Sequence, residues 1–107
     1  MSKFGHALLI CALLSALSSL AHAERGVVAL RVSGCDYYII SAPTGYVVAE
    51  WYGGYDPSRG DLVIGSFDGY GFKTLFFNSS QNEGRTYIED YMLDQDQALE
   101  QISEKCN

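Results

Sequence analysis

The chain has 107 residues, with 13 acidic side chains against seven basic ones, two histidines and three cysteines. This length fits a single domain. The excess of negative charge argues against nucleic acid and anionic lipid surfaces as partners, whereas it permits a basic partner.

Residues 1–23 have the three-part pattern of a cleaved secretory signal peptide. Lys3 precedes an apolar run over Ala7–Leu20, and the segment closes on small residues up to Ala23. The run is short for a membrane span, and the alternative is a retained N-terminal helix or anchor. We expect export to the periplasm or the cell exterior, with the mature chain starting at Glu24.

The predicted mature domain, residues 24–107, has 84 residues, six basic against 13 acidic side chains, and a net charge of −7. It has no histidine, because His6 and His22 both precede the predicted cut. Their loss excludes nucleophile–histidine pairs, histidine acid–base catalysis and imidazole zinc sites. We expect no cofactor, no metal and no membrane insertion after cleavage, since no second apolar run is long enough to span a bilayer.

Two cysteines remain in the predicted mature chain, Cys35 and Cys106. They are too few for a cysteine-only metal site, and they form no C-x-x-C motif that would indicate a redox pair. In an exported chain the pattern predicts one disulfide. Closing so long a loop would stabilise the fold by about 4 kcal/mol in the chain-entropy model.

Short aromatic and β-branched runs, separated by Gly, Pro, Asp and Asn, predict strands and turns. The strands are expected near Val27–Val32, Asp36–Ser41, Gly45–Tyr52, Asp61–Phe67, Phe72–Asn78 and Arg85–Met92. A tight turn over Ala42–Gly45 and a hairpin signal at Asp68-Gly69 separate neighbouring strands.

A helix is predicted after the last strand. Asp94 is an N-cap candidate, and Gln97 three residues later completes a capping box. The helix should end near Lys105 and dock through one face, formed by Leu99, Ile102 and Cys106.

These elements predict a mainly β fold with one C-terminal helix. Five or six short antiparallel strands in so small a domain favour a strongly bent sheet or a partly open barrel. The run Asp61–Phe67 and its continuation into Phe72–Asn78 resemble the central strands of SH3-like barrels. That resemblance implies an SH3-like size and architecture, and nothing about activity.

Side-chain alternation gathers tyrosine and glutamate on one face of the third strand and one face of the last. The candidate binding residues are Tyr46, Glu50, Tyr52, Tyr87, Glu89 and Tyr91. If the two strands are neighbours, these residues form one aromatic surface ringed by carboxylates, suited to a cationic or proline-rich peptide or to stacking on sugars. The alternative is that the rings pad a thin core. The opposite faces should point inward, with Val47, Ala49, Trp51, Ile88 and Met92 packing on Leu62, Ile64, Leu75, Leu99 and Ile102.

Two further motifs lie in predicted loops. The stretch Asp56–Asp61 has oxygen ligands for calcium without the full spacing, and it contains the adhesion tripeptide Arg59-Gly60-Asp61. A plain turn is the favoured interpretation of this Gly/Pro/Asp cluster. Asn78-Ser79-Ser80 is a formal glycosylation sequon, which matters only in a eukaryotic source.

The sequence therefore predicts a non-enzymatic, exported module that contacts a protein, peptide or glycan through its Tyr/Glu residues. One form of this function is a small inhibitor, because an acidic domain could cap a basic secreted hydrolase. The alternative is a small carboxylate-dependent glycoside hydrolase acting on cell-wall or extracellular sugars. Its acid–base pair would come from Glu50, Asp61, Asp68 and Glu89.

Overall fold

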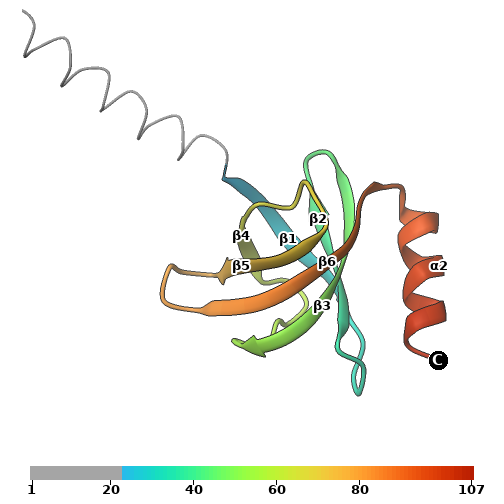
Figure 1. The fold of residues 1–107 in the computed structure, drawn as a ribbon, viewed down its shortest axis with the longest axis horizontal. Coiled ribbons are helices and arrows are strands. Elements are labelled where there is room, and N and C mark those ends of the chain that lie inside the picture. Colours follow the sequence, from blue (N-terminus) through green and yellow to red (C-terminus); the bar gives the residue numbers. More distant parts are fainter. Residues whose placement is uncertain (1–22) are drawn as a thin grey trace, which may run out of the picture.

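A computed structural model describes residues 23–107 as a small closed barrel of six antiparallel strands with one helix packed on its outside (Figure 1). The predicted signal peptide, with both histidines and Cys11, lies outside the described residues apart from Ala23. Within residues 23–107 no helix has both the length and the apolar character needed to cross a membrane.

The barrel consists of two consecutive three-stranded meanders. The elements are β1 (Glu24–Arg31), β2 (Tyr37–Ala42), β3 (Gly45–Gly54), β4 (Leu62–Gly65), β5 (Gly71–Phe77), β6 (Glu83–Leu93) and α2 (Gln95–Lys105). Pairing of β3 with β6 and of β1 with β4 joins the meanders into the order β1-β2-β3-β6-β5-β4. The predicted mainly β fold with a C-terminal helix is confirmed, and the barrel is closed, although β4 and β5 are joined by only two residue pairs.

The strand β3 contributes to two separate cores because its side chains alternate between the two sides of the barrel wall. Val47 and Ala49 point inward and Trp51 packs beside them, as predicted. Val48 points outward and is also buried, because α2 covers it. The barrel core includes Val28, Tyr38, Ile40, Val63, Phe67, Leu75, Phe77 and Ile88.

The helix α2 lies alongside β2 and β3 (Figure 1) and starts as predicted. Asp94 accepts a hydrogen bond from the Gln97 N–H at 2.8 Å, and the Gln97 side chain accepts one from the Asp94 N–H at 3.0 Å. The predicted docking face is wrong at one position. Ala98 and Ile102 are buried, whereas Leu99 is 43% exposed. The buried pair has i, i+4 spacing, which turns Leu99 toward the edge of the interface.

A disulfide joins Cys35 and Cys106, as predicted, with the two Cα atoms 5.6 Å apart. It ties the loop between β1 and β2 to the C-terminal end of α2. The bond is consistent with an oxidising, exported compartment.

The strand β6 departs from simple alternation near its C-terminal end, where its pairing with β3 shifts register twice. Extra residues in one strand reverse which face the following side chains occupy. Met92, expected inside, has a left-handed φ of 57° and is 63% exposed. Tyr91, expected outside, packs against the barrel core. Leu62 was also expected inside, but it is exposed because Val63 is the residue of β4 that points inward.

Candidate functional site

A row of four side chains crosses the outer wall of the barrel. Tyr37 on β2 pairs with Glu50 on β3, Glu50 pairs with Tyr87 on β6, and Tyr87 pairs with Phe72 on β5. Residues that pair directly across antiparallel strands have their side chains side by side on one face. The strands β3 and β6 are therefore neighbours, which is the arrangement that the Tyr/Glu surface requires.

Tyr52 completes an aromatic group at the centre of this wall. Its ring meets that of Phe72 edge to face, with centroids 4.9 Å apart, and Phe72 meets Tyr87 in the same way at 5.0 Å. Tyr52 is 52% exposed and Phe72 is 49% exposed. These rings therefore present apolar surface to solvent while contacting one another. We call the set formed by Tyr37, Glu50, Tyr52, Phe72, Tyr87 and Glu89 the Tyr/Glu face.

The Glu50 carboxylate affects the titration of two tyrosines, Tyr37 and Tyr52. Burial and a hydrogen bond to Glu50 raise the pKa of Tyr37 to about 12. Burial and the charge of Glu50 also raise the pKa of Tyr52 above its usual value. Both shifts have the same electrostatic contribution, because the charge of Glu50 disfavours a second negative charge on either phenol.

Each end of the Tyr/Glu face carries a cation of the chain itself over an aromatic ring. The Arg85 guanidinium carbon lies 4.8 Å from the Phe72 ring centroid, and the Lys105 Nζ lies 5.2 Å from that of Tyr37. Lys105 Nζ is also 3.6 Å from Glu89 Oε2. Positive groups at these distances are attracted by the ring quadrupole. The surface therefore already binds cations on its rings within the molecule.

The structure brings together four of the six residues predicted for this surface, namely Glu50, Tyr52, Tyr87 and Glu89. The other two are partly buried and pack against the cores. Tyr46 packs under α2, and Tyr91 packs against the barrel core because of the register shift in β6. The prediction of one exposed six-residue surface is wrong for these two tyrosines.

Sequence reasoning missed two members of the Tyr/Glu face. Tyr37 could have been found, because the tight turn at Ala42–Gly45 fixes the β2–β3 register and places Tyr37 opposite Glu50. Phe72 could not be placed in the same way. Its pairing with Tyr87 depends on the longer loop between β5 and β6, whose length does not fix a register.

The four carboxylates considered for sugar hydrolysis do not gather at one place. Glu50 and Glu89 belong to the Tyr/Glu face, whereas Asp61 lies in the β3–β4 loop and Asp68 lies next to Glu24. Burial and the neighbouring Asp68 raise the pKa of Glu24, which lies away from the Tyr/Glu face. No observation favours the hydrolase over the binding module.

The loop containing Arg59-Gly60-Asp61 is a structural turn. The Asp61 carboxylate accepts hydrogen bonds from the Ser58 N–H at 2.8 Å, the Tyr55 hydroxyl at 3.0 Å and the Asn78 amide at 3.0 Å. Although burial acts to raise its pKa, these donors outweigh burial and lower the pKa of Asp61. The sequon residue Asn78 is thus engaged in holding loops together, as is the aspartate of the adhesion tripeptide.

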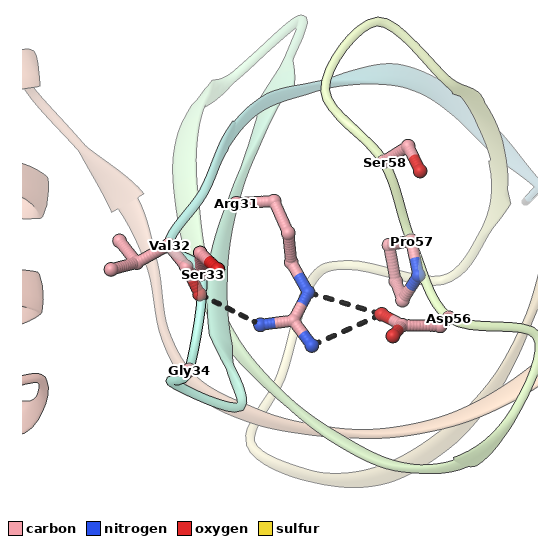
Figure 2. Close-up of a pocket in the computed structure, with 7 residues that line it drawn as sticks. All are labelled: Arg31, Val32, Ser33, Gly34, Asp56, Pro57 and Ser58. Carbon is pink, nitrogen blue, oxygen red and sulfur yellow. Dashed lines mark hydrogen bonds and ion pairs between the residues drawn. The ribbon is translucent and has the colours of Figure 1, made fainter.

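A hollow of about 400 Å³ at one end of the barrel is crossed by Arg31 (Figure 2). Its Nε and Nη2 donate to the Asp56 carboxylate at 3.1 and 3.0 Å. Its Nη1 donates to the carbonyl oxygens of Val32, at 3.3 Å, and Cys35. All three guanidinium nitrogens are therefore occupied, and Arg31 fastens the β1–β2 loop to the β3–β4 loop.

Comparison of the chain with models of protein families, with curated proteins and with solved structures found no match. Across residues 23–107, no three His, Cys, Asp or Glu side chains are grouped so that they could hold a metal ion.

Proposed function

We propose that the protein is an exported, non-enzymatic binding module that contacts its partner through the Tyr/Glu face. The observation that carries this proposal is the continuous row Tyr37–Glu50–Tyr87–Phe72, with Tyr52 beside it, on the outer wall of four strands. Exposed aromatic rings supply large contact area with little loss of side-chain freedom on binding.

A protein or peptide partner that carries positive charge fits this surface best. The predicted mature chain has a net charge of −7, and its own cations already sit on rings at both ends of the Tyr/Glu face. Opposite charge on a partner would speed association and fix its orientation. A basic secreted enzyme, inhibited when the acidic barrel covers its substrate channel, is one partner of this kind.

The experiment is a titration followed by NMR, with isotopically labelled residues 24–107. The probes are a penta-arginine peptide, a proline-rich peptide and a chitin oligosaccharide. We expect the peptides to shift resonances of Glu50, Tyr52, Phe72 and Tyr87. Resonances of Val27, which is 44% exposed on β1, a strand that pairs only with β2 and β4 among the described strands, should stay in place. Shifts centred on Val27, or none with any probe, would refute the assignment of the face.

Export is tested separately, by measuring the intact mass of the protein recovered from outside the cytoplasm. Protein recovered from outside the cytoplasm should begin at Glu24, because the predicted cut follows Ala23. Recovery of a product that retains residues 1–23 would contradict the signal-peptide prediction and return both histidines to the functional chain.

A further inference from the structure

A hollow of about 390 Å³ lies beside the disulfide, at the β2 end of the Tyr/Glu face. It is lined by Cys35, Asp36, Tyr37, Glu50, Lys105 and Cys106. The hollow therefore combines an aromatic ring with two carboxylates, which are the groups that recognise ammonium and guanidinium ions.

Lys105 shows how a positive group is held here. Its ammonium lies over the Tyr37 ring and within 3.6 Å of the Glu89 carboxylate. The side chains of Lys105 and Glu89 are 34% and 23% exposed, so water screens their attraction and the pair is easily exchanged. The carboxylates of Asp36 and Glu50 line the same hollow, so three acidic side chains share this single ammonium as their nearby cation in the hollow.

The backbone at Lys105 is held by the disulfide, whereas its side chain can change conformation. Cys106 is the next residue, and its bond to Cys35 holds the end of α2 against the barrel. The lysine side chain has a flexible four-carbon stem. Its ammonium can thus swing into solvent without any movement of the helix.

We propose that this hollow is a subsite for a lysine or arginine side chain of a protein partner, and that Lys105 occupies it until the partner binds. The inference rests on the proposed function, because it assigns the partner chemistry for one end of the Tyr/Glu face. A guanidinium in the hollow would stack on the Tyr37 ring and pair with Glu50, while the displaced Lys105 would be solvated.

The test is calorimetric titration of the disulfide-bonded domain with penta-arginine. We expect Lys105→Gln to bind the peptide about two- to fivefold more tightly than wild type, the range of an exposed ion pair. Arg59→Gln is the matched control, since it removes the same charge from an exposed loop outside the hollow. We expect it to change the affinity less. Glu50→Gln should weaken binding.

The outcomes separate the two proposals. Equal affinities of Lys105→Gln and Arg59→Gln would overturn the role of Lys105 while leaving the Tyr/Glu face intact. Binding of a chitin oligosaccharide without penta-arginine binding would overturn the basic subsite and assign the face to sugars. Failure of both probes on wild type would refute the proposed function itself. Movement of the Lys105 Nζ resonance on titration of wild type gives a second readout that needs no variant.

Discussion

Tyr37 and Tyr38 are adjacent in the sequence and lie on opposite sides of the barrel wall. Tyr38 is fully buried, and its hydroxyl lies 2.6 Å from the Thr86 hydroxyl inside the barrel. Tyr37 lies outside, where it contacts the Lys105 ammonium and the Glu50 carboxylate. The same residue type thus makes a polar contact inside the core in one case and, in the other, lies partly buried on the outer wall at the edge of the α2 cluster. We infer that the inner rings hold the fold and that the outer rings are available for a partner.

The largest expected effect comes from a matched pair of phenylalanines on β5. Phe77 is fully buried in the barrel, so Phe77→Ala should lower the free energy of unfolding by about 3–5 kcal/mol through lost burial and a cavity. Phe72 faces outward, so Phe72→Ala should cost about 1 kcal/mol or less. Denaturant unfolding measures both values, and similar losses would break the distinction between inner and outer rings.

Removal of the disulfide should have the next largest effect. Cys35→Ser with Cys106→Ser should lower the free energy of unfolding by about 2–5 kcal/mol, because the unfolded chain regains the entropy of a long open loop. Denaturant unfolding of the oxidised protein and of the double variant gives the difference. A change of only a few tenths of a kcal/mol would show that the barrel and α2 hold together without the bond.

A smaller loss of stability is expected from removing single hydroxyl groups from the adjacent residues Tyr37 and Tyr38. Tyr38→Phe leaves the buried Thr86 hydroxyl without its partner at 2.6 Å, and should cost about 1–3 kcal/mol. Tyr37→Phe removes a hydroxyl on the outer wall, where water can replace it, and should cost about 0.5 kcal/mol or less. Thermal or denaturant unfolding of the two variants checks the order, and the reverse order would contradict the assignment of sides.

The last effect is a pH dependence of stability that is confined to alkaline pH. The pKa of Tyr37 is raised to about 12, whereas an unfolded tyrosine titrates near 10. The stability that this phenol contributes is therefore complete below pH 10 and is lost as the pH rises toward 12. Wild type should lose stability relative to Tyr37→Phe across this interval. Parallel stability curves of the two proteins would contradict the raised pKa.

Most of the architecture followed from local patterns, because each strand and the helix carries its own signals. The turn chemistry at Ala42–Gly45 and the capping box at Asp94 predicted where elements begin and end. Alternation assigned Val47 and Ala49 correctly to the interior. Closure of the barrel through β1–β4 pairing is a long-range contact that no local pattern specifies.

The candidate site was predicted in part, and its errors have two physical causes. A β-bulge inserts residues without any sequence signal that alternation can detect, so Tyr91 and Met92 were assigned to the wrong sides of β6. The helix then covers part of the outer wall and partly buries Tyr46, which the strand pattern alone leaves exposed. Neither feature is visible until strands are paired in three dimensions.

The most direct test of the central claim measures stability and binding in the same protein. We expect Tyr52→Ala combined with Phe72→Ala to lower the affinity for penta-arginine at least about tenfold, a loss of about 1.4 kcal/mol of binding free energy. The free energy of unfolding of this double variant should fall by about 2 kcal/mol or less. Val27→Ala, at an exposed position on β1, should leave the affinity unchanged. Unfolding of the double variant would contradict the account, because the outer rings would then be needed for the fold. Unchanged affinity in a folded double variant would also contradict it, because the outer rings would then have no role in binding.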